Sequence, residues 1–334
     1  MRLPAIVKKS SCEGRKVFEA VNAKTDFDSC RPLEEGGPAA ARLGENRDIP
    51  SSLRIIDGPM LASASVRKGK KREHCQDAAI SFSSRRATLV GVLDGFGNQG
   101  TFLSEAVADG LIGDMSFQAK HDPLPSDARG LLVSAVFNAL EYFTPPPGRE
   151  GRGGTTAALA LVAPDGAFSA AGIGDSAIYV LRRRGVERLF SSYRLDGYLH
   201  PVAGAPLFQY FAERNVLSSA INADGINPKA VDISYGYISP GECLLIVTDG
   251  ITKSLSVIYD PRTACIRDNS GCRDLRSILR GERNPERVVE KLLKAMEGRI
   301  EGSPDDGCFR FVGRNDAMYP VDDDMALIAI GFAR

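Results

Sequence analysis

The sequence of 334 residues contains no tryptophan and only three histidines, His74, His121 and His200. Because zinc and copper sites are usually built from histidine and thiolate ligands, this scarcity argues against a histidine-based metal centre. The cysteines are seven, an odd number, and no two have the Cys-x-x-Cys spacing. This pattern argues against a disulfide framework or a thiolate zinc site and favours a reducing compartment.

Long apolar runs and an excess of charge are also lacking. No apolar segment is long enough to span a bilayer, and the first residues lack the apolar core of a secretory signal. Forty-two basic residues balance forty-two acidic ones, so the net charge gives no reason to expect a nucleic-acid partner. We therefore expect a soluble, cytoplasmic protein without a membrane span, and by default a monomer.

From Leu53 onward the sequence is a succession of short apolar, strand-like runs joined by turn residues. Helical patterns are fewer: one is expected over about 101–115, one begins after Ser126, and one begins at Asn284 and ends at Gly298. A doubly wound parallel sheet needs a helix after nearly every strand, and this chain does not have them. The pattern therefore predicts an α+β fold in layers, with antiparallel strands.

Residues 1–52 mix charges, glycine and proline without sustained periodicity. We predict that they form a flexible N-terminal extension and that residues 53–334 form a single domain. Residues 256–280 and 302–321 have the character of insertions, and we interpret both as surface loops.

Aspartate-glycine pairs end two of the apolar runs, in "LVGVLDGFGNQG" at 89–100 and in "LLIVTDGITKSL" at 244–255. An Asp-Gly pair is a strong hairpin signal, but here a helical pattern rather than a second strand follows each pair. Acidic residues also border strands at Asp77 and at 322–324. A single loop acid is usually just solvated, whereas four acidic positions at strand ends repel one another and need a cation.

The ligand types point to the kind of ion. Oxygen donors without histidine or thiolate favour hard ions, namely Mg²⁺ or Mn²⁺. Two such ions can hold a hydroxide and clamp phosphate oxygens, which fits hydrolysis of a phosphate ester. Arg72, five residues before Asp77, is a candidate to bind the phosphate through two parallel hydrogen bonds.

Six motifs, taken in order, resemble the signature of the metal-dependent protein phosphatases of the protein phosphatase 2C (PPM) family. They are "REHCQDA" (72–78), "LDGFG" (93–97), "GGTTAA" (153–158), "GIGDSAIYV" (172–180), "VTDGI" (247–251) and "DDMALIAI" (323–330). The resemblance spans residues 60–332. It implies a central β-sandwich of two antiparallel sheets flanked by helices on both sides.

The resemblance also implies roles for individual residues. Asp94 would bridge two metal ions, and the Gly95 carbonyl would bind one of them. Asp249 and Asp323 would complete the shell of the other ion. Asp77 would act in or just outside the ligand set.

Two further positions match the family pattern, Arg72 as the phosphate-binding residue and Asp175 as a ligand of a third, weaker metal ion. The implied cofactors are thus two, possibly three, Mn²⁺ or Mg²⁺ ions. The implied reaction is attack of a hydroxide bridging two of them on phosphoserine or phosphothreonine of a phosphoprotein.

Several positions depart from the family pattern. Gln76 stands where many members have glutamate, Cys75 replaces an asparagine, and Phe96 occupies the place of a histidine that can act as a general acid. Residues 191–200 do not match the expected segment beside the active site. These departures leave open a catalytically silent relative that binds or regulates a phosphoprotein, and a third alternative is an unrelated metallohydrolase.

Overall fold

Two large antiparallel sheets and a small one make up the computed structural model. It describes residues 17–20, 39–44, 51–57, 60–70, 72–121, 127–141, 143, 152–190, 206–213, 217, 219–301, 310–318 and 322–332. The first sheet has the order β1 (Val17–Ala20), β3 (Ser51–Asp57), β4 (Met60–Arg67), β18 (Met325–Phe332), β13 (Cys243–Val247), β9 (Ala177–Arg182) and β10 (Gly185–Arg188). The second has the order β12 (Asp232–Tyr237), β8 (Ala167–Ile173), β7 (Gly153–Val162), β6 (Thr88–Gly97), β5 (Asp77–Ser83) and β2 (Ala39–Gly44), with β11 (Ile221–Asn222) beside β7.

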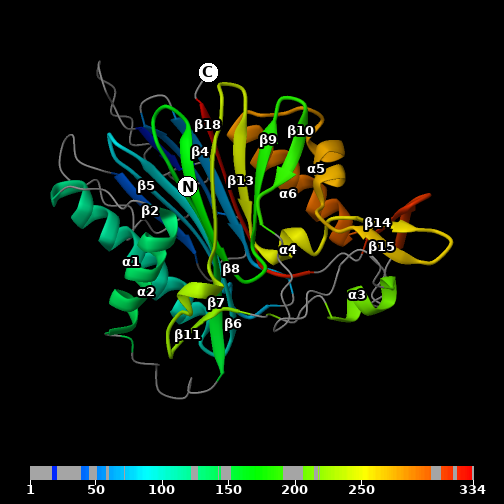
Figure 1. Ribbon diagram of the computed structural model, residues 1–334, viewed down its shortest axis with the longest axis horizontal. Coiled ribbons are helices and arrows are strands. Elements are labelled where there is room, and N and C mark those ends of the chain that lie inside the picture. Colours follow the sequence, from blue (N-terminus) through cyan, green and yellow to red (C-terminus); the bar gives the residue numbers. More distant parts are fainter. Residues whose placement is uncertain are drawn as a thin grey trace, which may run out of the picture.

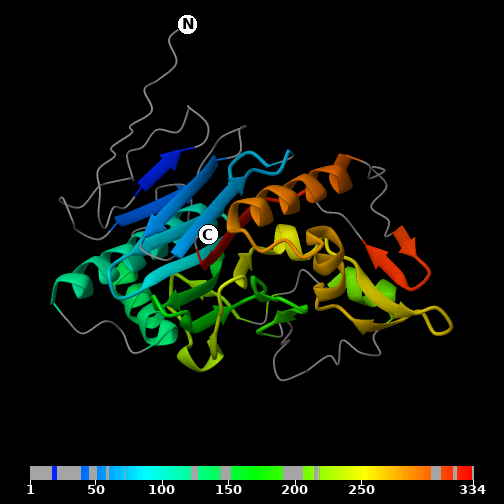
Figure 2. The same ribbon diagram turned by 90° about the horizontal axis from the view of Figure 1, so that it is seen from above.

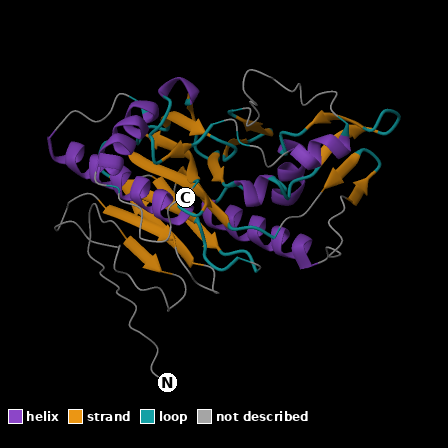
Figure 3. Cartoon of the chain, turned by 90° about the horizontal axis from the view of Figure 1, so that it is seen from below, coloured by secondary structure: helices purple, strands orange, loops and turns teal. Residues whose placement is uncertain are grey.

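Helices cover the outer faces of the two large sheets (Figure 1; Figure 3). The second sheet packs against α1 (Gly100–His121) and α2 (Ala128–Glu141), and the first against α4 (Asp249–Thr252), α5 (Cys272–Leu279) and α6 (Pro285–Glu301). The predicted fold class, a sandwich of two antiparallel sheets with helices on both sides, is confirmed. No helix in the described ranges is both long and apolar enough to cross a membrane.

Burial on both faces explains why the strand patterns are apolar almost throughout. In β6, Val90 and Val92 point between the sheets, while Leu89 and Leu93 point to the helices α1 and α2. Successive side chains of a strand face opposite sides, so a strand covered on both sides needs an apolar residue at every position. All six residues of the run "TLVGVL" are buried, as expected for a strand covered on both faces, and β6 lies between β7 and β5 in its sheet.

A third, four-stranded sheet lies beside the sandwich at the end that carries α4 and α5 (Figure 2). It consists of β15 (Cys265–Asp268), β14 (Val257–Asp260), β17 (Asp316–Met318) and β16 (Arg310–Gly313), and α3 (Leu207–Glu213) packs on it. The interpretation of 256–280 and 302–321 as surface loops is therefore wrong for their described parts. Val257, Tyr259 and Ile266 form a small apolar core there with Leu207.

Helix and strand ends differ from the predictions in three places. Helix α6 continues past Gly298 to Glu301, and α1 runs to His121. Strand β6 does not end at Asp94 but continues to Gly97, because residues 94–97 keep pairing with β7. Ser126, the predicted start of a helix, lies outside the described residues.

The N-terminal segment contributes strands to both large sheets. Strand β1 pairs with β3, and β2 pairs with β5 from Ala39↔Ser83 to Gly44↔Ala78. Both strands lie within residues 1–52, so the chain before residue 53 has paired backbone in these two places. The boundary of the predicted domain stays a prediction.

Candidate metal centre

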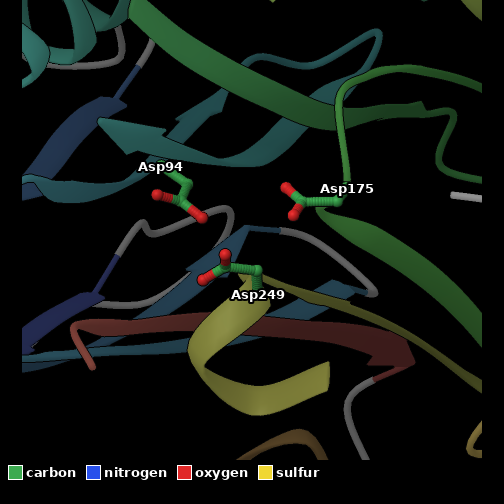
Figure 4. Close-up of side chains that lie close together, drawn as sticks. All are labelled: Asp94, Asp175 and Asp249. Atoms are coloured by element: carbon green, nitrogen blue, oxygen red, sulfur yellow. The ribbon is translucent and has the colours of Figure 1, made fainter. Parts of the chain in front are cut away.

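Three aspartates from different parts of the chain meet at one end of the sandwich. Asp94 lies on β6 of the second sheet, Asp249 begins α4 directly after β13 of the first sheet, and Asp175 lies in the turn that joins β8 to β9 across the two sheets. Each offers a carboxylate oxygen, and these oxygens lie within 4.8 Å of one another. Figure 4 shows the three carboxylates pointing toward a common space.

The glycines of both Asp-Gly pairs allow close backbone packing rather than a tight turn. A Cβ at Gly95 would lie 2.5 Å from the Gly100 carbonyl oxygen, and one at Gly250 would lie 1.9 Å from the Asp324 carbonyl oxygen. Neither glycine has the positive φ that hairpin turns require. In each pair the residue after the aspartate must therefore be glycine, because neighbouring backbone atoms fill the place of a side chain.

Burial and mutual repulsion raise the pKa values of the clustered carboxyls. Burial, followed by the nearby Asp249, raises the pKa of Asp94 well above its usual range, and the same two causes raise that of Asp175 to about 7. Asp94 Oδ2 and Asp175 Oδ1 are buried and have no hydrogen-bond partner among the described residues. Buried, unpartnered carboxylate oxygens are costly unless a cation binds them, and an all-oxygen donor set fits a hard divalent ion.

Asp77 lies beside this group without being part of it. It is opposite Asp94 in the β5–β6 register and is buried. Its Oδ2 accepts a hydrogen bond of 2.7 Å from the Thr248 hydroxyl, whose oxygen accepts one of 2.8 Å from the Ala326 amide. Thr248 thus ties β5 of one sheet to β18 of the other. Burial and the charge of Asp324 raise the pKa of Asp77 well above its usual range.

The acidic run before β18 is held by the loop that precedes β5. Arg72 donates through Nε to Asp323 Oδ1 over 2.9 Å, and its Nη2 contacts the same oxygen. Asp324 accepts hydrogen bonds from the backbone amides of Gly69 and Gln76, at 2.9 and 2.8 Å. The two residues expected to bind phosphate and metal, Arg72 and Asp323, are therefore paired with each other, and the Arg72 side chain is 46% exposed.

Cys75, the residue that replaces the family's asparagine, is buried next to Asp77. Burial and the neighbouring Asp77 raise the pKa of its thiol far above the ordinary value. The reactive thiolate is thereby disfavoured, which argues that Cys75 is a packing residue rather than an oxidation-sensitive one.

One charged residue of the site, Lys253, was not predicted from the sequence. Lys253 forms an ion pair with Asp249 Oδ2, and its Nζ lies 4.0 Å from Asp323 Oδ2. Its side chain is only 12% exposed. The signal was present in "TDGITK", because residues four apart on a helix lie on the same face.

Comparisons with known proteins bear on the fold of this chain. No family model matches the sequence, and no curated protein sequence matches it either. Solved structures do match. The PPM Ser-Thr phosphatase MsPP from Mycobacterium smegmatis, in complex with cacodylate, has a TM-score of 0.54 and 22% identity, over 81% of this chain and 98% of that one. The serine/threonine phosphatase PstP/Ppp of Mycobacterium tuberculosis has a TM-score of 0.54 and 17% identity, over 82% and 99%.

The chain has the PPM phosphatase fold. The resemblance inferred from six short motifs is thus confirmed at the level of the fold. A further neighbour with this fold, PppA, is a key regulatory component of T6SS in Pseudomonas aeruginosa, with a TM-score of 0.51 and 18% identity over 82% of this chain and 98% of that one.

Within the PPM fold of this chain, the predicted site residues fall into two groups. Asp94, Asp175 and Asp249 share one space. Asp77 accepts a hydrogen bond from Thr248, the residue before Asp249, and Asp323 lies 4.0 Å from Lys253, which pairs with Asp249. The individual metal and phosphate roles of all these residues stay predictions.

Proposed function

We propose that this protein is a metal-dependent serine/threonine protein phosphatase that uses Mn²⁺ or Mg²⁺ to hydrolyse phosphoserine or phosphothreonine in a phosphoprotein. The observation that carries this proposal is the meeting of Asp94, Asp175 and Asp249 within 4.8 Å, in the PPM phosphatase fold. Buried oxygens of Asp94 and Asp175 without a hydrogen-bond partner support it further.

The aspartates of the site have different roles in this proposal. Asp94, Asp175 and Asp249 hold divalent ions, with Asp323 and the Gly95 carbonyl as the further donors that the resemblance implies. When bound, these ions supply an activated water and neutralise charge on the phosphate. Asp77, fixed by the Thr248 hydroxyl and opposite Asp94 on the neighbouring strand, positions Asp94.

In this proposal Arg72 binds the substrate phosphate. Its guanidinium now pairs with Asp323, and because the side chain is partly exposed it can exchange this carboxylate for phosphate oxygens. In this proposal the Asp323 charge released by the exchange is available to a metal ion.

Metal removal tests the proposal. We expect the purified protein to release phosphate from a phosphothreonine peptide with Mn²⁺ or Mg²⁺, and to lose at least about 99% of this activity in EDTA, because the ions supply the nucleophile. Adding Mn²⁺ back should restore it. Turnover that survives EDTA, or no turnover with either ion, would contradict the proposal.

Replacing Arg72 by lysine should weaken substrate recognition. Lysine keeps the charge but lacks the planar pair of donors, so we expect kcat/KM to fall by about 10- to 100-fold, as for the loss of a hydrogen bond to a charged group. Steady-state kinetics on the phosphothreonine peptide measure this. The matched control is Arg267→Lys, an exposed arginine paired with Asp260 on the third sheet, which should leave kcat/KM unchanged; an unaffected Arg72→Lys would remove Arg72 from the phosphate site.

A second function is favoured by the ion pairs of the site. Arg72 forms an ion pair with Asp323, and Lys253 forms one with Asp249. Carboxylates that are already paired with basic side chains are expected in a catalytically silent relative that binds or regulates a phosphoprotein. This alternative predicts calorimetrically measurable binding of Mn²⁺ without any phosphate release.

A further inference from the structure

A largely enclosed lysine lies beside the carboxylate cluster, in contact with Asp249. Lys253 follows α4, and its backbone amide donates a 2.7 Å hydrogen bond to the Asp249 carbonyl oxygen. This helical turn places the Lys253 side chain on the same face as Asp249, four residues earlier. The side chains of Lys253, Asp249 and Asp323 are only 12, 12 and 13% exposed.

The positive charge of Lys253 lies among carboxylates. Its ammonium pairs with Asp249 and lies 4.0 Å from Asp323 Oδ2, so it offsets part of the negative charge of the cluster.

The ammonium lies between the two carboxylates that the family resemblance assigns to one metal ion. It contacts Asp249 and lies 4.0 Å from Asp323, the two carboxylates that would hold the same metal ion. A divalent ion held by these two carboxylates would lie close to the ammonium, and like charges repel each other strongly in a partly buried site. The Lys253 ammonium and a divalent ion therefore compete for this pair, whereas the unpartnered oxygens of Asp94 and Asp175 remain available.

We propose that the Lys253 ammonium occupies the cation position between Asp249 and Asp323, so that the protein binds one divalent ion tightly and a second only by displacing Lys253. This inference rests on the proposed function, because it takes the cluster to be a divalent-ion centre. Lys253 is thus a positioning residue that sets how many ions the site holds.

Calorimetric titration of the metal-free, full-length protein with Mn²⁺ tests this. Wild type should bind one Mn²⁺ tightly. Lys253→Met, which keeps most of the side-chain length without the charge, should bind a second ion at least about tenfold more tightly than wild type does. Lys253→Arg, which keeps the charge, should behave as wild type. Lys291→Met is the matched control, because Lys291 pairs with Glu282 at the surface, 3.5 Å away.

Thermal unfolding gives a second readout, independent of turnover. Without metal, Lys253→Met should melt at a lower temperature than wild type, because the carboxylates lose their internal cation. Mn²⁺ should then raise its melting temperature more than that of wild type, since an ion that binds the folded state stabilises it. If Lys253→Met does not fold without metal, recovery of the folded protein in Mn²⁺ is the expected result.

The outcomes separate this inference from the proposed function. Equal Mn²⁺ stoichiometry and affinity in wild type and Lys253→Met, together with Mn²⁺-dependent turnover, overturn the role of Lys253 and leave the phosphatase intact. Absence of Mn²⁺ binding in both proteins overturns the inference and the metal-dependent function together.

Discussion

Asp94→Asn will reduce Mn²⁺-dependent phosphate release by about a thousandfold or more, because one of the three clustered carboxylates loses its charge and, in the proposed function, the metal ion loses a ligand. Asparagine has nearly the same shape as aspartate, so the backbone of β6 and its pairing with β5 and β7 stay in place. The measurement is turnover of the phosphothreonine peptide at saturating Mn²⁺, beside a calorimetric titration with the ion.

The stability of the same variant separates loss of function from unfolding. The pKa of Asp94 is raised in the folded protein, first by burial and then by Asp249. A carboxyl whose pKa is higher in the folded than in the unfolded state binds more protons when folded, so its ionisation at neutral pH opposes folding. The metal-free Asp94→Asn protein should therefore be at least as stable toward urea as wild type at pH 7.

The control for this variant is Asp165→Asn, at the exposed turn between β7 and β8, where asparagine keeps the acceptor for the Ala167 amide. It should change neither turnover nor stability. An Asp94→Asn protein with undiminished turnover would remove Asp94 from the metal centre, and an inactive, unfolded one would leave a structural role as the explanation.

The features of this site that depend on residues close together in the chain can be predicted from the sequence. Each Asp-Gly pair is visible as an aspartate after an apolar run, and the run itself shows that the strand is buried on both faces. The order of the strand runs and their turns predicts antiparallel sheets, and the six motifs add the layered PPM fold. The convergence of Asp94, Asp175 and Asp249 follows once the two sheets face each other.

Features that depend on distant pairing are not accessible in the same way. The contact of Arg72 with Asp323 joins residues 251 positions apart, and no local pattern shows that these two charges pair with each other. The third sheet was missed because its strands are three or four residues long and are separated by turns. Lys253 was overlooked because a lysine after a short helix is usually solvated.

Gly250→Ala will destabilise the protein by about 3 kcal/mol, the upper part of the range for an overpacked site. The added Cβ would lie 1.9 Å from the Asp324 carbonyl oxygen and 3.1 Å from the Met325 side chain. The clash involves backbone, which no side-chain rotation relieves. To make room, α4 must move away from the segment before β18, and it carries Asp249 with it. Mn²⁺ affinity should therefore fall along with stability.

Urea unfolding of the metal-free protein measures the first effect, and calorimetric titration with Mn²⁺ measures the second. Gly298→Ala is the matched control, because it makes the same substitution inside α6, where the added Cβ meets no atom within 4 Å beyond the adjacent residues and the backbone of the helix itself. Alanine is the better helix former, so this variant should gain about 0.5–1 kcal/mol. A Gly250→Ala protein as stable as wild type would mean that the Asp324 carbonyl can shift freely, and the close packing of the second Asp-Gly pair would then not be what holds Asp249 in the site.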